Sequence, residues 1–192
     1  MNTVSPRHMS NVVGFDDAPF TPEYTGPVKV VGTVYARQRL TGVLVGDVLK
    51  DGDDAAEALA RLVAGSKFAG NLHLVMLQGI ALGGFNVVDV FHLHARLGLP
   101  ILVVSRRAPD MDAIRDALLT QIPGGAQKWA IIERLGPMEP LHHVYVQRVG
   151  LTLSQADAVL RQFSVEGHIP EPLRAAHLIA GALVDGQSRG RV

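Results

Sequence analysis

Three apolar, β-branched runs in the first fifty residues constrain the fold of this chain more than any other feature. Residues 11–15, 28–35 and 41–48 are rich in Val, Thr, Leu and Phe, a composition that favours strands. The short polar link at residues 37–39 suits a hairpin turn between the second and third runs. The chain therefore begins with three consecutive strands, which are expected to pair in an antiparallel arrangement.

The rest of the chain alternates between helical and extended patterns. Apolar spacing and helix-start signals predict helices over residues 54–62, 85–97, 112–121 and 154–163, the last with Ser154 as N-cap, and a final helix opening at Pro170 and Pro172. Apolar runs predict strands over residues 72–77, 101–105, 129–133 and 144–149. This order predicts an α/β fold with a ribonuclease H-like mixed sheet, three antiparallel strands then parallel strands, flanked by helices.

The composition is that of a chain that folds. Apolar residues make up 47% and charged residues 19% of the 192 residues, enough apolar surface to offset chain entropy. The length favours a single domain over residues 1–192, with an ordered core over about 11–185 and a loosely held tail from Gly186 onward. No membrane-spanning stretch or secretory signal is visible in the sequence, so a cytoplasmic location is expected.

The amino-acid composition and the absence of known motifs exclude several classes of chemistry. The chain has no cysteine, which excludes disulfides, thiolate zinc sites and cysteine nucleophiles but leaves oxygen-ligated metals. Eighteen basic and eighteen acidic residues give no global positive field, so a nucleic-acid surface has to be local. The signatures of serine hydrolases, phosphate-binding loops and dinucleotide-binding domains are absent.

Six sequence blocks, in this order, resemble endonuclease V relatives and most closely the largely archaeal endonuclease dU family. They are GFDDAPF (residues 14–20), KDGDDAAEAL (50–59), LQGIALGGFNVVD (77–89), GLP (98–100), IPEPLRAAH (169–177) and GQSRGR (186–191). The resemblance covers nearly the whole chain. It implies a ribonuclease H-like fold, a carboxylate site for Mg²⁺ or Mn²⁺, and cleavage of DNA near a deaminated base such as deoxyuridine.

Within that resemblance, carboxylates at strand ends are the candidate metal ligands, because hydrolysis of a phosphodiester by such a site needs a metal that activates water. Asp16 closes the first strand where the endonuclease V family has its first metal aspartate, and Asp17 alternates to the opposite face. Asp51 or Asp54 lies where endonuclease V carries a glutamate ligand. The predicted metal ligands are therefore Asp16, Asp51 and Asp54. Capping and turn roles are the alternative for these acidic residues.

The candidate nucleic-acid contacts are Gly83, Gly84, Asn86 and Arg174. Glycines that open a helix let backbone N–H groups approach a phosphate or a flipped base, although a tight strand-to-helix turn explains them equally well. For Asp89, capping the start of a helix is the favoured role and metal binding is the second. Asp17, Asp89 and His177 are secondary site candidates. DNA is the expected partner, RNA is an alternative, and the sequence does not indicate an oligomeric state.

Two departures from the endonuclease V pattern leave a second function open. Gln78 stands where an aspartate of an Asp-Gly pair is expected, and a neutral carbonyl attracts a divalent cation less strongly than a carboxylate does. The pair Gly150-Leu151 stands where a Gly-His pair is expected. A weakened or inactive homologue that binds nucleic acid or a protein partner is therefore the alternative function. A small-molecule-binding domain is a third possibility, favoured if an apolar pocket lies away from the carboxylates.

Overall fold

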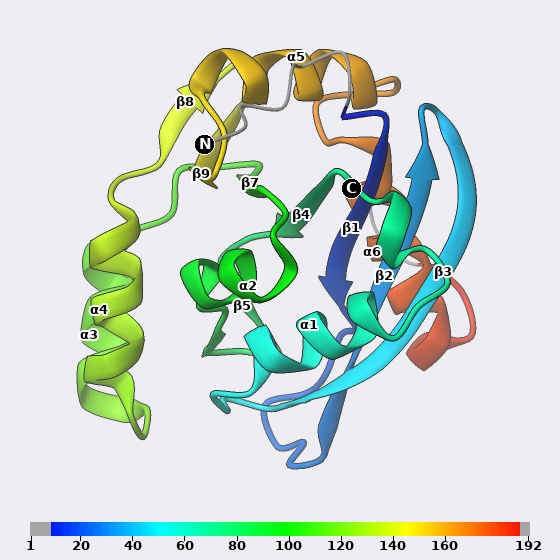
Figure 1. The fold of residues 1–192 in the computed structure, drawn as a ribbon. Coiled ribbons are helices and arrows are strands. Elements are labelled where there is room, and N and C mark those ends of the chain that lie inside the picture. The colour runs from blue at the N-terminus through cyan, green and yellow to red at the C-terminus, as the bar shows by residue number, and fades with distance from the viewer. Residues whose placement is uncertain (1–8, 189–192) are drawn as a thin grey trace.

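A seven-stranded mixed sheet forms the centre of the protein, in the order β3-β2-β1-β4-β7-β9-β8. The structure is a computed structural model that describes residues 9–188. Its strands are β1 (Asn11–Asp17), β2 (Pro27–Ala36), β3 (Arg39–Leu49), β4 (Leu74–Gln78), β7 (Ile101–Ser105), β8 (Glu139–Leu141) and β9 (Val144–Val149). Figure 1 shows the long, curved β2–β3 pair on one side of the molecule.

Strand pairing confirms the predicted order. β1 pairs antiparallel with β2, and β2 pairs antiparallel with β3 through the predicted hairpin. β4 then joins β1 in parallel, and β7 joins β4 in parallel. β9 and β8 add a second antiparallel margin on the far side of β7. The carboxyl ends of β1, β3, β4 and β7 consequently lie along one edge of the sheet.

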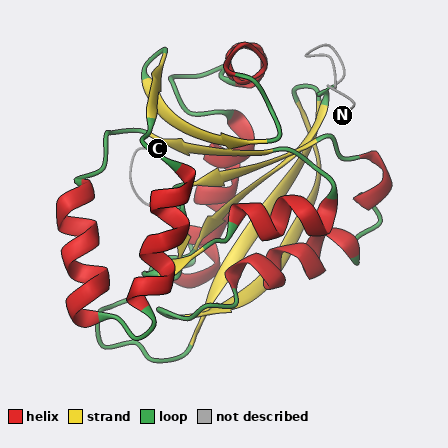
Figure 2. Cartoon of the chain, turned by 60° about the vertical axis from the view of Figure 1, so that its left-hand side comes forward, coloured by secondary structure: helices red, strands yellow, loops and turns green. Residues whose placement is uncertain are grey.

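The helices cover both faces of the sheet (Figures 1 and 2). They are α1 (Ala55–Ala64), α2 (Val90–Leu97), α3 (Met111–Gln121), α4 (Gly125–Leu135), α5 (Leu153–Phe163) and α6 (Glu171–Asp185), with a short 3₁₀ turn at Ala69–Asn71. Residues of α1 and α2 share one apolar core with one face of the sheet, while α5 and the start of α6 share a second core with the other face. α3 and α4 pack on one another beside the sheet.

Three sequence predictions about local structure were wrong. Residues 129–133, predicted extended, lie inside α4, because Trp129 and Ile132 pack with α3 and a short apolar run fits either period. The predicted helix 85–97 begins only at Val90, since Asn86–Val87 (β6) pairs with Ala81–Leu82 (β5) in a separate hairpin.

The third concerns the start of α5. Thr152, rather than Ser154, is the N-cap: its hydroxyl accepts from the Gln155 N–H, and the Gln155 side chain accepts from the Thr152 N–H. This reciprocal pair satisfies backbone donors that the helix itself leaves unpaired. Asp89 caps α2 as expected, accepting from the N–H groups of Phe91 and His92.

Two further expectations concern the ends of the chain and the membrane. Within residues 9–188, no helix is long and apolar enough to cross a bilayer. α6 ends at Asp185, and Gly186 closes it in a left-handed conformation. Most of the tail predicted to be loosely held, residues 189–192, lies outside the described part, as do residues 1–8.

Candidate active site

Asp16 and Asp17 end β1 and point to opposite faces of the sheet, as strand geometry requires. Asp16 is only 5% exposed and faces α6. Its Oδ1 accepts the Asp17 backbone N–H at 2.9 Å, and its Oδ2 lies 2.8 Å from His177 Nδ1 on α6. The first strand and the last helix, 161 residues apart in sequence, therefore meet at this carboxylate.

The close approach of α6 to β1 sets this contact. Gly14 faces the start of α6, and a Cβ there would come within 2.7 Å of the Pro172 carbonyl carbon. Thr33 of β2 fixes the same turn, because its hydroxyl donates to the Pro172 carbonyl at 2.5 Å. The missing side chain at Gly14 thus lets the helix lie close enough for His177 to reach Asp16.

His177 is a partly exposed base held by a buried acid. Its side chain is 42% exposed, while that of Asp16 is 7% exposed. The hydrogen bond to Asp16 raises the pKa of His177 above its ordinary value, and partial burial opposes that rise. The imidazole is therefore held in protonated form to higher pH than a free histidine.

Gln78 ends β4 directly beside Asp16. Phe15 is in register with Leu77 in the parallel β1–β4 pair, so Asp16 and Gln78 are the next residues along each strand and share the α6 face. The Gln78 Oε1 atom is buried and accepts no hydrogen bond from any residue in the described range 9–188. Because buried polar atoms are nearly always paired, an unpaired acceptor marks a place where a ligand or water belongs.

Asp17 links β1 to the β5–β6 turn on the opposite face. Its Oδ2 accepts the Gly83 backbone N–H at 2.8 Å. Burial and the neighbouring Asp16 carboxylate raise the pKa of Asp17 to about 6, although the Gly83 hydrogen bond works against that rise. Asp17 therefore holds the glycine turn at the edge of the sheet.

Asp51 holds the same turn from the end of β3. Its backbone N–H donates to the Gly83 carbonyl at 2.8 Å, and its Oδ1 accepts the Phe85 N–H at 2.8 Å. Asp51 has a positive φ of 53°, which costs energy for a residue other than glycine. The buried Lys128 of α4 donates to the Asp51 carbonyl at 2.6 Å, and burial lowers the pKa of that lysine.

Asp54 and Asn86 form a buried junction between β3, α1 and β6. Asp54 Oδ1 accepts from the Leu49 N–H at 3.0 Å and from Asn86 Nδ2 at 2.7 Å. Asn86, fully buried, also donates to the Leu49 carbonyl and accepts the Ala55 N–H that opens α1. Both side chains are occupied by groups that tie the elements together.

The structure thus separates the candidate residues into two groups. Asp16, Gln78 and His177 lie on the α6 face, whereas Asp17, Gly83 and Asp51 are linked on the other. Nowhere in the described residues do three acidic or histidine side chains gather in a geometry suited to a metal ion. The remaining candidates lie elsewhere: Arg174 forms a two-point ion pair with Glu171, and Gly84 is an exposed turn residue whose added Cβ would clash with Asp51.

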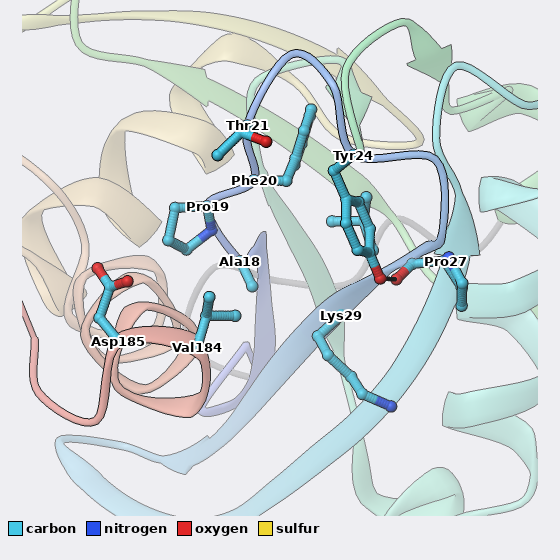
Figure 3. A pocket seen from close by; sticks show the side chains of 10 residues that line it. Ala18, Pro19, Phe20, Thr21, Tyr24, Pro27, Lys29, Val184 and Asp185 are labelled. Carbon is cyan, nitrogen blue, oxygen red and sulfur yellow. Dashed lines mark hydrogen bonds between the residues drawn. The ribbon is translucent and has the colours of Figure 1, made fainter.

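Two neighbouring pockets open beside Asp16. One, of about 420 Å³, is lined by Asp16, Asp17, Ala18, Pro19, Phe20, His177, Gly181 and Asp185. The second, of about 380 Å³, is mainly apolar and shares its wall of Ala18, Pro19, Phe20 and Asp185 with the first. Figure 3 shows Phe20 and Tyr24 of the β1–β2 loop on one side of this second pocket and Val184 and Asp185 of α6 on the other. Sequence patterns did not indicate these aromatic residues, because they lie in an irregular Pro-containing loop.

Comparison with solved structures defines the class of fold. Endonuclease V of Ciona intestinalis, solved in complex with a 24mer DNA containing an inosine followed by a ribo-adenosine, superposes with a TM-score of 0.56 at 12% identity, over 87% of this chain and 82% of that one. At such identity the likeness concerns the fold alone. The protein thus has the ribonuclease H-like fold of endonuclease V.

Closer relatives define the family. The sequence matches the family described as Endonuclease dU over residues 8–184, and the protein belongs to that family. A UPF0215 protein of Deinococcus radiodurans is 55% identical over 186 residues, which cover 97% of this chain and 94% of that protein. A crystal structure of a protein of unknown function from Archaeoglobus fulgidus is 33% identical and has a TM-score of 0.84, covering 91% of this chain and 98% of that one.

Proposed function

We propose that this protein is a divergent, metal-dependent endonuclease of DNA repair that cleaves DNA near deaminated bases of the deoxyuridine type. The observation that carries this function is the buried, unpaired Gln78 Oε1 next to the Asp16 carboxylate, at the carboxyl ends of β1 and β4. Membership of the Endonuclease dU family supports the reaction class. The inosine-containing DNA bound by the Ciona endonuclease V supports a nucleic-acid substrate.

The residues on the α6 face fit a divalent cation held by two protein oxygens. Asp16 accepts one hydrogen bond at Oδ1 and contacts His177 at Oδ2, and an ionised carboxylate has about four acceptor positions, so two remain. Gln78 Oε1 supplies a neutral oxygen, and hard cations such as Mg²⁺ and Mn²⁺ accept carboxylate and amide oxygens. When bound, the ion would supply an activated water and stabilise charge on the phosphate.

His177 would handle a proton at the same site. The hydrogen bond to Asp16 raises the pKa of the imidazole and so favours its protonated form, and the partly exposed ring lies on the wall of the pocket that also contains Asp16. A cationic donor at this position can hydrogen-bond a phosphate oxygen of the substrate. Asp16 orients this donor through Nδ1.

The adjoining apolar pocket suits a nucleobase next to the scissile phosphate. Phe20 and Tyr24 offer aromatic surfaces, and Lys50 Nζ lies 5.5 Å from the centre of the Phe20 ring. Stacking on aromatic side chains is how many proteins hold unpaired bases. Because this pocket shares a wall with the Asp16 pocket, a base held in it would lie next to the proposed metal site.

Asp51, Asp54 and Asn86 would act as positioning residues in this scheme, because they hold the β5–β6 turn through the hydrogen bonds given above. Gly84 would then present backbone to the nucleic acid at the sheet edge, whereas the N–H and carbonyl of the buried Gly83 are paired with Asp17 and Asp51. Arg174, paired with Glu171, is assigned no direct contact.

One observation favours the alternative function, a nucleic-acid-binding homologue without cleavage. Of the two oxygen donors proposed for the ion, the Asp16 carboxylate carries the charge and the neutral Gln78 amide contributes none. A site with a single negative charge binds a divalent ion weakly compared with a site of two or three carboxylates. The decisive comparison is therefore between the cleavage activity of the natural chain and that of the Gln78→Asp variant.

The test is cleavage of DNA oligonucleotides that contain deoxyuridine or deoxyinosine, with Mg²⁺ or Mn²⁺, by the full chain. The variants are Asp16→Ala, Gln78→Asp and, as a matched control, Asp53→Ala, which removes an exposed carboxylate. Metal-dependent cleavage that disappears in Asp16→Ala and persists in Asp53→Ala supports the endonuclease.

The same assay separates the two functions. No cleavage by the natural chain, with cleavage by Gln78→Asp, identifies a homologue that has lost its activity. No cleavage by either chain, at any metal concentration, removes the endonuclease proposal. Binding of the same oligonucleotides, measured by fluorescence anisotropy, then decides whether a binding function remains.

A further inference from the structure

The outer edge of β3 is an unusually open surface. β3 is the terminal strand of the sheet and runs for 11 residues, and no segment in the described range 9–188 pairs with its outer side. Figure 1 shows it as a long ribbon at the margin of the molecule. Long, unpaired edge strands offer free backbone donors and acceptors, and proteins usually block them with proline, charge or a bulge.

One face of β3 is covered and the other is apolar and exposed. Towards α1, Leu62 occupies the space next to Gly46, and Phe68 occupies the space next to Gly42. On the opposite face, Val43 is 42% and Val45 is 47% exposed, because α6 packs across β1 and β2 and leaves β3 uncovered. Apolar side chains on an open edge strand favour a partner strand.

The sequence of β3 is complementary to itself in one antiparallel register. A two-fold axis through Val43 places Arg39 opposite Asp47 of a second copy, and by symmetry this pair occurs twice. Val43 then faces Val43 across the axis, and Thr41 faces Val45. Each glycine faces a leucine: Gly42 lies opposite Leu44, and Gly46 lies opposite Leu40.

The next two registers towards the carboxyl end of β3 lose the Arg39–Asp47 pair. An axis one residue further along the strand, at Leu44, places Arg39 opposite Leu49 and Thr41 opposite Asp47. An axis at Val45 places Val43 opposite Asp47. Among these three registers, only the one centred on Val43 places Arg39 opposite Asp47.

The charges of β3 are also available for this contact. Arg39 is exposed and has no carboxylate partner within residues 9–188. Asp47 is bound on one side by Lys29 of β2, at 2.9 Å, and both side chains are nearly half exposed. An arginine from a second copy would approach Asp47 from its open side.

We propose that two copies of this protein associate through β3 in an antiparallel pair centred on Val43. The dimer joins the two sheets into one continuous sheet, and the open β3 edge of each copy becomes paired. The contact is isologous, so it closes on itself and does not propagate into fibres. This pairing does not depend on the cleavage activity proposed above.

The first test is the mass of the full chain in solution, by analytical ultracentrifugation over a range of concentrations. The expected mass is twice 20.6 kDa. Val43→Lys places like charges against each other at the axis and is expected to give a folded monomer, since this side chain is exposed and lies outside the core. A natural chain that stays monomeric up to about 0.1 mM rules out this dimer.

Charge reversal tests the register. Arg39→Asp alone and Asp47→Arg alone each place like charges opposite one another, and each is expected to weaken dimerisation at least about tenfold. The double variant Arg39→Asp/Asp47→Arg restores opposite charges and is expected to restore the dimer. Arg107→Asp, an exposed reversal after β7, is the matched control and is expected to leave the mass unchanged.

Two results contradict the β3 contact. A dimer that survives Val43→Lys and both single reversals uses a different surface. A double variant that stays as monomeric as the single variants shows that Arg39 and Asp47 do not face each other.

Discussion

Two acidic strand ends lie on the same edge of the sheet, and they differ in what their oxygens do. At the end of β1, Asp16 keeps acceptor capacity on the wall of a pocket, beside the unpaired Gln78 Oε1. At the end of β3, Asp51 and Asp54 use their Oδ1 atoms to accept from backbone N–H groups of Phe85 and Leu49. A buried acceptor therefore lacks a donor at the first end, whereas the acidic side chains of the second end hold neighbouring segments in place.

This difference shows that the role of an acidic cluster depends on which groups its oxygens hydrogen-bond, and not on its charge alone. Aspartates after a strand stabilise turns and helix starts in many proteins. What distinguishes Asp16 is that a buried acceptor next to it lacks a donor. The four predictions below test whether the β1 end carries chemistry and the β3 end carries stability.

The largest expected effect is on cleavage. Asp16→Asn is expected to lower the cleavage rate about a thousandfold, because it removes the negative charge that would hold the cation. The same change at Asp54 is expected to leave the rate within about threefold, since an asparagine oxygen still accepts from Leu49 and Asn86. Single-turnover rates at saturating Mn²⁺ measure both. Equal losses in the two variants would remove the distinction between the strand ends.

The next largest effect is on the free energy of unfolding and concerns the residues at the end of β3. Asn86→Ala is expected to lower the free energy of unfolding by about 3 kcal/mol, because it leaves the Ala55 N–H without its partner and removes the Asn86 hydrogen bonds to the Leu49 carbonyl and to Asp54. Asn11→Ala, which removes an exposed hydrogen bond to the Asn71 carbonyl, is the control and should cost under about 1 kcal/mol. Urea denaturation followed by circular dichroism gives both values. Similar losses would show that the junction is not a stabilising element.

A smaller effect depends on pH. The folded-state pKa of Asp17, about 6, lies above its ordinary value of 3.8, so its contribution to stability is fully present below pH 3.8 and is lost as the pH rises through 6. Asp17→Asn keeps an acceptor for Gly83 and removes the buried charge. We expect the variant to gain about 3 kcal/mol relative to the natural chain between pH 3 and pH 7, the interval that contains both pKa values. Parallel stability curves for the two proteins over that interval would contradict this.

The smallest effect sharpens the assignment of Gln78. Gln78→Leu replaces a buried, unpaired carbonyl with an apolar group of similar size, and we expect the free energy of unfolding to stay equal or rise by about 1 kcal/mol. Cleavage should be lost in the same variant. A marked loss of stability would indicate that Oε1 has a partner in the folded protein, and the ligand site would then have to be reconsidered.

The fold was largely predictable because β-branched runs and short links specify strands and their neighbours. Helix α4 was missed, since Trp129, Ile131 and Ile132 fit an extended run as well as a helix face. At the site, the resemblance identified Asp16 and His177 as candidates. The hydrogen bonds that the Asp51 and Asp54 side chains accept were not predictable from the sequence. Their partners Phe85 and Asn86 lie more than thirty residues away in sequence, and only folding brings them together.

Gly14 illustrates how far the requirements of a site extend beyond the polar groups that line it. It has no side chain, lines neither of the two pockets beside Asp16, and is covered by α6. Any larger residue would push the start of that helix outward and carry His177 away from its carboxylate. A survey of tolerated substitutions would therefore find a position as restricted as Asp16, although an inventory of reactive groups would omit it.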